Sequence, residues 1–256
     1  MIGAIIGDII GSRFEHRRIK TMDFNLFTKQ NRFTDDSVLT IAIADAILTN
    51  TSFSKKLKEY YKLYPNAGYG LFFHIWAKSD LDKGYNSWGN GSAMRVSPIA
   101  WAFDTLDEVL KKAKESAEIT HNHPEGIKGA QATASAIYLA RIGTPKEKIK
   151  EFIEERFNYN LNFTIEELRP KYNFDISCNG SVPPAIKAFL ESKDFENSIR
   201  LVISLGGDSD TLGAINGAIA HAFYGIPNEI KQIGYSYLDE HLRRITKEFC
   251  DKFNCG

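Results

Sequence analysis

Residues 204–227 read SLGGDSDTLGAINGAIAHAFYGIP and contain a helix together with the polar turn that opens it. Along the helical part, apolar side chains recur every three or four residues until a glycine and a proline end the pattern: Leu212, Ile215, Ile219, Phe223, Gly225 and Pro227. Just before it, Asp208, Asp210 and Thr211 place three oxygen-bearing side chains within four residues. A single acid would be enough to cap the free backbone N–H groups, for about 0.5–2 kcal/mol. The turn is therefore either an elaborate helix cap or a site for a metal ion or polar ligand.

A second stretch, residues 32–39 (RFTDDSVL), opens another helix in the same way. Its apolar positions again recur at spacings of three and four: Val38, Leu39, Ala42, Ile43, Ala46 and Ile47. Thr34, Asp35 and Asp36 mirror the acids of the first stretch. If the two helix starts face each other, four carboxylates and two hydroxyls converge, and their repulsion requires cations. Two divalent cations would balance four carboxylates, and an all-oxygen ligand set favours Mg²⁺, Mn²⁺ or Ca²⁺ over zinc.

The composition limits the classes of function. The chain has 256 residues, and Lys plus Arg equals Asp plus Glu at 32 each, so its charge does not indicate electrostatic binding of nucleic acid or membrane. Three cysteines without a C-x-x-C pair point to reduced thiols in the cytoplasm. No repeat, low-complexity tract or linker divides the chain, so we expect one all-α domain over residues 1–256. Neither charge nor a heptad pattern suggests more than a monomer.

The N-terminal stretch predicts a buried helix. It lacks the basic start of a signal peptide and is too short to cross a bilayer. Gly3, Gly7 and Gly11 recur at every fourth position, which places three small residues on one helix face for close backbone packing. The same helix would bring Asp8 and Glu15 to one end of the core, although a spacing of seven is also that of a plain amphipathic helix.

Most of the remaining chain is helical in pattern. Further helices are expected over residues 53–63, 71–77, 97–103, 107–119, 125–141, 146–157, 184–190, 195–205 and 229–251. Residues 197–205 also read as a strand, but their helical context favours a helix. Residues 20–32 are expected to form a loop, and the weakly periodic residues 158–180 are expected to form an extended excursion over the ligand site.

Five blocks, in this order, resemble the ADP-ribosylglycohydrolases, which include the dinitrogenase-reductase-activating glycohydrolases and the animal ADP-ribosyl hydrolases. The blocks are Gly3–Glu15, Phe33–Ser37, Gly89–Arg95, Thr120–His121 and Gly206–Thr211. The resemblance implies an all-helical fold with two Mg²⁺ ions, or Mn²⁺ as an alternative, at the base of an ADP-ribose cleft. The metal ligands that it implies are Thr34, Asp35, Asp36, Asp208, Asp210 and Thr211.

The resemblance also implies roles for single residues. Glu15 matches a glutamate at the reaction centre, whereas without the family it reads as a surface acid among basic neighbours. Asp36 and Asp210 are the alternative carboxylates for proton transfer. The substrate contacts that we expect are Gly68, Tyr69, Gly70, Trp88, Gly89, Asn90, Gly91, Ser92, Met94 and His121. Glycines allow a ligand to approach the backbone and aromatic rings offer a surface for adenine, although the same turns could simply pack on the core.

The implied function is Mg²⁺-dependent hydrolysis of the glycosidic bond between ADP-ribose and an acceptor, foremost a side chain of a mono-ADP-ribosylated protein. Two alternatives come from other classes. One is a non-catalytic protein that binds ADP-ribose, and the other is a metal hydrolase that acts on a different ribosyl or nucleotide compound. The intact set of six ligands argues against the first.

Overall fold

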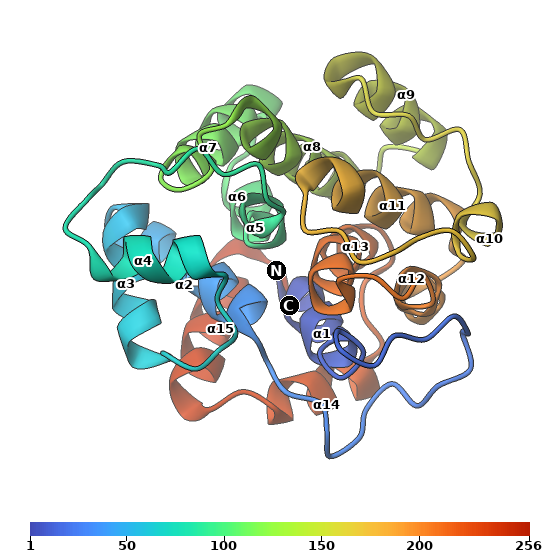
Figure 1. Ribbon diagram of the computed structural model, residues 1–256, viewed down its shortest axis with the longest axis horizontal. Helices are drawn as coiled ribbons and strands as arrows, with labels where there is room; N and C mark the ends of the chain where they lie inside the picture. Colours follow the sequence, from blue (N-terminus) through green and yellow to red (C-terminus); the bar gives the residue numbers. More distant parts are fainter.

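Two closely packed helices form the centre of the molecule. The computed structural model describes residues 1–256; in it, α13 (Ser209–Tyr224) lies against α1 (Ile2–Gly11), and every residue of α1 is buried (Figure 1). Gly3, Gly7 and Gly11 face Gly217, Gly213 and Ser209 of α13, so the helices are antiparallel. A methyl group at Gly7 would overlap with the carbonyl oxygen of Gly213. The predicted stripe of small residues is thus the contact surface of the central pair.

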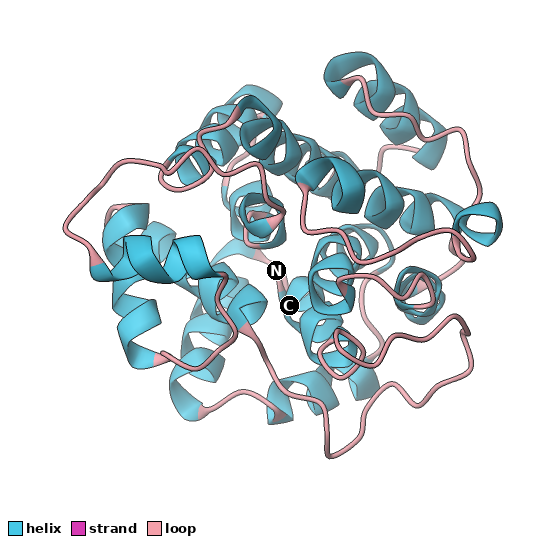
Figure 2. Cartoon of the chain, viewed as in Figure 1, coloured by secondary structure: helices cyan, strands magenta, loops and turns pink.

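The remaining helices surround this pair, and no strand is formed (Figure 2). They are α2 (Asp35–Thr49), α3 (Phe53–Leu63), α4 (Leu71–Lys78), α5 (Gly91–Met94), α6 (Ser97–Ala102), α7 (Leu106–Glu118), α8 (Pro124–Arg141), α9 (Lys146–Phe157), α10 (Ile165–Leu168), α11 (Cys178–Glu191), α12 (Phe195–Ile203), α14 (Asn228–Ser236) and α15 (Glu240–Phe253). Helices α8, α11 and α12 pack on α13, while α2 and α14 contact α1. The expected all-α fold is confirmed.

One continuous hydrophobic core of 67 buried residues connects these elements. It includes side chains from both ends of the chain, from Met1 in front of α1 to Cys255 behind α15. None of the helices has both the length and the apolar composition needed to cross a bilayer.

The helix boundaries follow the apolar periodicity closely, but residues 229–251, expected to form one or two helices, form two (α14 and α15), the short α5 and α10 were not predicted, and the limits of α11 and α1 differ. Helices α3 and α9 span the predicted residues, and residues 195–203 form a helix rather than a strand. Helix α11 begins at Cys178, earlier than the predicted start at Pro184, because Ser177 caps it through the backbone N–H of Gly180. Helix α1 ends at Gly11, so Glu15 lies in the turn that follows the helix rather than on it.

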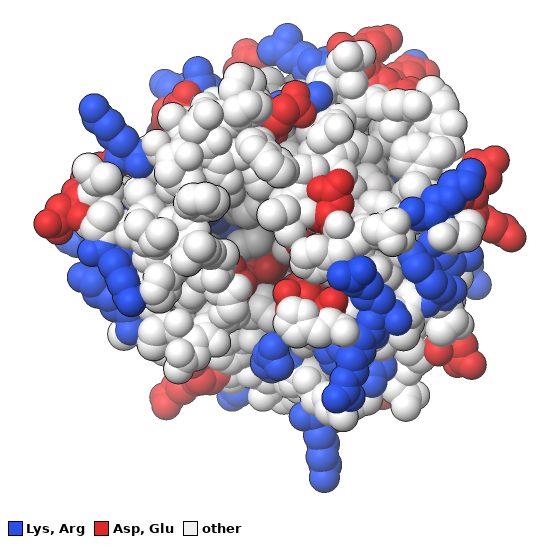
Figure 3. All heavy atoms as spheres, in the orientation of Figure 1, with Lys and Arg blue, Asp and Glu red and all other residues white.

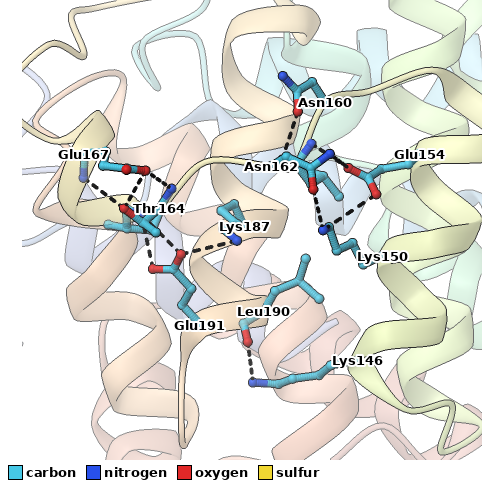
Figure 4. Close-up of polar contacts among 12 residues, drawn as sticks. Lys146, Lys150, Glu154, Asn160, Asn162, Thr164, Glu167, Lys187, Leu190 and Glu191 are labelled. Carbon is cyan, nitrogen blue, oxygen red and sulfur yellow. Dashed lines mark hydrogen bonds and ion pairs between the residues drawn. The ribbon is translucent and has the colours of Figure 1, made fainter.

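Polar contacts fasten the excursion that follows α9 (Figure 4). Glu154 accepts hydrogen bonds from the backbone N–H of Leu161 and the side chain of Asn162, both at 3.0 Å. Farther along, Thr164 and Glu167 cap α10 reciprocally, and Glu191 of α11 accepts the N–H of Ile165 at 3.1 Å. The segment is therefore tied to α9 and α11 before it leads into α11.

Candidate active site

The polar starts of α2 and α13 meet beside the end of α1. The antiparallel packing of α1 and α13 places Ser209 against Gly11, which brings the acids that open α13 next to the turn carrying Glu15. Oxygen atoms of Asp8, Asp36 and Asp210 lie within 4.8 Å of one another, and so do those of Glu15, Asp208 and Asp210. The predicted convergence of the two helix starts is thus present in the structure.

Asp8 is a member of this cluster that sequence reasoning did not include among the ligands. It is fully buried in the middle of α1 and accepts hydrogen bonds from the backbone N–H groups of Thr34 (2.9 Å) and Ser37 (3.0 Å). The hydroxyl groups of both residues also donate to it, that of Thr34 at 2.7 Å. Asp8 therefore caps the start of α2 from a different helix. The feature of the sequence that could have pointed to Asp8 is that it is a single acid within an apolar stretch.

Burial and mutual repulsion raise the pKa values of the clustered aspartates. Burial raises the pKa of Asp8 to about 6, against the opposing effect of its hydrogen bonds. Burial, followed by the charges of Asp8 and Asp208, raises the pKa of Asp35 to about 8. The pKa values of Asp36 and Asp210 are raised well above the usual range, mainly by burial, and burial also raises that of Asp208. Such a cluster favours either bound protons or bound cations.

The cluster suits a divalent cation in its chemistry. Asp36 is only 3% exposed, and its Oδ1 atom is buried without a hydrogen-bond partner. An orphaned carboxylate oxygen is costly unless a cation or donor contacts it. All the atoms in the cluster that could bind a metal ion are oxygen atoms, which are the ligands that hard ions such as Mg²⁺ prefer. The clustered acids could therefore hold a metal ion.

Neighbouring polar groups orient the acids of α13. Asn90 donates from its amide nitrogen to Oδ2 of Asp208 at 2.8 Å and to the hydroxyl of Ser181 at 3.0 Å. The backbone N–H of Thr211 donates to Oδ1 of Asp210 at 3.0 Å, and the hydroxyl of Thr211 lies 3.8 Å from the sulfur of Met94. Asn90 and Met94, expected to contact substrate, thus lie directly against the acidic cluster.

A cleft of about 570 Å³ opens above the acids. Figure 3 views the molecule onto this face, where acidic side chains lie at the floor of a central hollow with mostly uncharged walls. All six predicted metal ligands and Glu15 line the cleft. The predicted substrate contacts that line it are Gly68, Gly70, Gly89, Asn90, Gly91, Met94 and His121.

Three predicted contacts lie outside the cleft lining. Tyr69 stacks on Phe73 with ring centres 5.3 Å apart, and its hydroxyl is buried without a partner. Trp88 is 50% exposed, and the buried hydroxyl of Ser92 donates to the carbonyl of Gly126 at 2.7 Å. These positions are those of packing and surface residues, and a substrate-binding role for Tyr69, Trp88 and Ser92 stays a prediction.

The walls of the cleft include residues that were not among the expected contacts. Phe72 of α4 is 69% exposed and stacks on Tyr85 with ring centres 6.1 Å apart. Phe174, at the end of the excursion, lines the cleft as well, and the guanidinium of Arg18 lies 5.0 Å from its ring centre. The guanidinium-bearing Arg95, which is fully buried, also belongs to the lining. The cleft thus combines an acidic floor with aromatic walls.

Glu15 occupies the edge of the cluster. Its side chain is 24% exposed, and burial, followed by the charge of Asp208, raises its pKa, while His16 and Arg32 oppose the shift. A carboxyl group with a raised pKa at a cleft edge keeps its proton to a higher pH than a free carboxyl group and can donate it to a bound ligand. This position is consistent with acid–base chemistry at the floor of the cleft.

Comparison with known proteins yields relatives that match this chain over most of their own length. ADP-ribosylhydrolase ARH3 of Homo sapiens is 26% identical over 97% of this chain and 92% of its own, and ARH3 of Gallus gallus is 27% identical over 88% and 84%. ADP-ribosylarginine hydrolase Tri1 of Pseudomonas putida is 23% identical over 98% of this chain and 77% of its own. A solved structure described as an ADP-ribosylglycohydrolase-related protein complex shares the fold, with a TM-score of 0.75 at 23% identity over 97% of this chain and 95% of that chain. Because the ADP-ribosylglycohydrolase sequence model matches residues 1–254, the chain belongs to the ADP-ribosylglycohydrolase family.

Proposed function

We propose that this protein is a Mg²⁺-dependent hydrolase that cleaves the bond between the anomeric carbon of ADP-ribose and an acceptor, releasing ADP-ribose. Membership of the family supports hydrolysis of ADP-ribose linkages. The observation that carries the proposal is the buried acidic cluster at the floor of the cleft, with an orphaned oxygen on Asp36. A cleft of about 570 Å³ is within the usual size range of small-molecule sites.

The residues that would hold two Mg²⁺ ions, or Mn²⁺ as the alternative, come from both helix starts. They are Thr34, Asp35 and Asp36 before α2 and in its first turn, and Asp208, Asp210 and Thr211 at the start of α13, with Asp8 beneath them. When bound, the ions would neutralise the carboxylates, orient ribose hydroxyl groups and lower the pKa of a coordinated water.

The chain's own residues perform the remaining steps in this proposal. Hydrolysis at an anomeric carbon builds positive charge on the sugar, which nearby carboxylates stabilise. Glu15, whose pKa is raised and which lies beside Asp208 and Asp210, would give a proton to the departing acceptor atom and regain one from the water that bonds to the anomeric carbon. Asp36 and Asp210 are the alternative proton carriers. The glycines at 68, 70, 89 and 91 leave room for a ligand to approach the backbone.

The acceptor is proposed to be a protein side chain carrying mono-ADP-ribose. The name of the Pseudomonas putida relative gives it an ADP-ribosylarginine substrate, which makes arginine one acceptor to test and serine a second. We further propose a single domain over residues 1–256, a monomer and a cytoplasmic location. The balance of 32 basic and 32 acidic residues gives no reason to propose binding of nucleic acid or membrane.

The test is release of free ADP-ribose from proteins mono-ADP-ribosylated on arginine or on serine, with Mg²⁺ and with EDTA. We expect release from at least one of these substrates in Mg²⁺, loss of release in EDTA, and loss of at least about 100-fold in Asp208→Ala. Asp45→Asn is the matched control, since Asp45 is also buried on α2 but pairs with Lys56 at 2.8 Å, away from the cluster. ADP-ribose binding without release from either substrate would favour a non-catalytic binding protein, and no binding at all would favour a hydrolase of another nucleotide compound.

A further inference from the structure

A buried arginine lies behind the histidine of the cleft. Arg95 follows α5 and is fully buried, and its Nη2 donates to the hydroxyl of Thr120 at 2.7 Å and to the carbonyl of Ser116 at 3.2 Å. The same hydroxyl lies 2.7 Å from Nδ1 of His121, which lines the cleft and packs near Tyr85. Arg95, Thr120 and His121 therefore form a chain that leads from the core to the cleft.

Proton counting sets the direction of these bonds. A guanidinium only donates, so the oxygen of Thr120 accepts from Arg95. Thr120 is fully buried, and the only other partner of its hydroxyl group is His121. If Nδ1 of His121 also donated to Thr120, the threonine proton would be buried without an acceptor, at a cost of about 1–3 kcal/mol. The favoured arrangement has Thr120 donating to an unprotonated Nδ1, which leaves the imidazole proton on Nε2.

Burial, aided by a neighbouring charge, keeps this imidazole neutral. Burial, and then the charge of Arg95, holds the pKa of His121 well below its usual value. A neutral imidazole has one N–H, and its position depends on the partner of the other nitrogen. The Arg95–Thr120 pair thus affects both the charge and the tautomer of His121.

The protonated nitrogen faces the glycine loop of the cleft. A Cβ atom placed on Gly91 would lie 3.0 Å from Nε2 of His121, and one placed on Gly89 would lie 3.6 Å away. The space that these glycines leave free is therefore the space into which the Nε2–H group can donate. A ligand oxygen beside the loop would be its acceptor.

We propose that Arg95 and Thr120 are positioning residues that fix His121 as the Nε2–H tautomer, so that it donates a hydrogen bond to an oxygen of ADP-ribose beside Gly89 and Gly91. The choice of ligand rests on the proposed function, whereas the tautomer does not. Thr120 acts through His121, and Arg95 acts through Thr120.

The test compares Thr120→Val, which is nearly isosteric but lacks the hydroxyl, with Thr120→Ser, which keeps it. Imidazole ¹⁵N spectra of histidine-labelled protein, with His121→Asn to assign the signals, report the tautomer without any ligand. We expect wild-type protein and Thr120→Ser to show Nε2–H, and Thr120→Val to lose this single tautomer. Calorimetry should give an ADP-ribose dissociation constant about 10-fold weaker for Thr120→Val, as expected for one hydrogen bond, and near wild type for Thr120→Ser.

An Nδ1–H signal for His121 in the wild-type protein, or an unchanged spectrum in Thr120→Val, would overturn the proposal. An altered tautomer with unchanged ADP-ribose affinity would overturn the donor role of His121. If the wild-type protein binds no ADP-ribose, the proposed function fails, while the spectra still decide whether Thr120 sets the tautomer. Melting temperatures of the variants show whether each one is folded.

Discussion

Replacing Asp36 with asparagine should stabilise the protein without metal and remove most of the stabilisation that metal ions give to the wild-type protein. Asp36 is buried, its carboxylate lies within 4.8 Å of those of Asp8 and Asp210, and one of its oxygens has no partner. Asparagine keeps the shape and removes the charge. The variant therefore separates the repulsion that the cluster imposes on the metal-free protein from the stabilisation that bound metal ions give.

The magnitude follows from the separation of the charges. Two carboxylates less than 5 Å apart repel by about 3 kcal/mol at an effective dielectric constant of about 20. Burial, followed by the charges of Asp8 and Asp35, raises the pKa of Asp36 well above its usual value, so the metal-free fold bears this repulsion or binds a proton to relieve it. Asp36→Asn should gain about 3 kcal/mol in EDTA, or roughly 6–12 °C in melting temperature. In Mg²⁺ at about 100 times its dissociation constant, wild type gains about 2.7 kcal/mol and the variant should gain far less.

The assay is thermal unfolding at about pH 8 in EDTA and in millimolar Mg²⁺, with Asp45→Asn as the control. Asp45 is also buried on α2, but it accepts from Lys56 at 2.8 Å and from the hydroxyl of Tyr60 at 3.0 Å. Its replacement should destabilise the protein by about 1–3 kcal/mol, equally in both buffers, since it removes the ion pair with Lys56 while Glu59 still lies 3.3 Å from the Lys56 ammonium group. The reasoning fails if Asp36→Asn is destabilised in EDTA, or if both variants respond to Mg²⁺ as wild type does.

Three further predictions concern pH, packing and proton transfer. Burial raises the pKa of Asp8 from 3.8 to about 6, so the folded metal-free protein binds this proton more tightly than the unfolded chain does. Urea melts in EDTA should therefore show that about 3 kcal/mol of stability is lost as the pH rises from about 4 to above 6. The pKa of Asp35, which is raised to about 8, extends this decline in stability toward pH 8. Saturating Mg²⁺ should flatten the decline. A stability that rises over this pH interval in EDTA would contradict the prediction. Gly7→Ala should lower the free energy of unfolding by about 1–3 kcal/mol in chemical denaturation and weaken Mg²⁺ binding, because its methyl group meets the backbone of Gly213. Gly70→Ala, where no atom lies within 4 Å of the added methyl group, should be close to wild type in stability. Glu15→Gln should reduce the rate of ADP-ribose release about 100-fold or more with nearly unchanged ADP-ribose affinity, and a wild-type rate would transfer the proton role to another carboxylate.

Sequence patterns within the helices predicted most of the fold. The glycines of α1 have no alternative use in a buried helix, so their four-residue spacing already predicted a close helix contact, although not that α13 provides it. The acids at the starts of α2 and α13 exceed what helix capping requires, and this excess predicted their convergence. Helix starts and helix faces are local properties, which explains why the sequence reveals them.

Contacts between distant residues could not be read in the same way. Asp8 was visible as an acid in an apolar run, but its four hydrogen bonds to the start of α2 depend on how α1 and α2 pack. Tyr69 lies beside two glycines of the cleft, yet its ring packs on Phe73, because successive side chains of a turn point in different directions. The partner of Arg95 is likewise on a separate segment. Such roles depend on tertiary packing, which no local pattern contains.

The most direct test of the central claim is a calorimetric titration of the purified protein with ADP-ribose, in Mg²⁺ and again in EDTA, with Asp208→Ala alongside. If the acidic cluster holds metal ions that position ADP-ribose, binding will be seen in Mg²⁺, will weaken strongly in EDTA, and will be lost in Asp208→Ala but kept in Asp45→Asn. Equal binding by wild type in both buffers, or full binding by Asp208→Ala, would contradict the claim that this cluster is the metal-dependent floor of an ADP-ribose site.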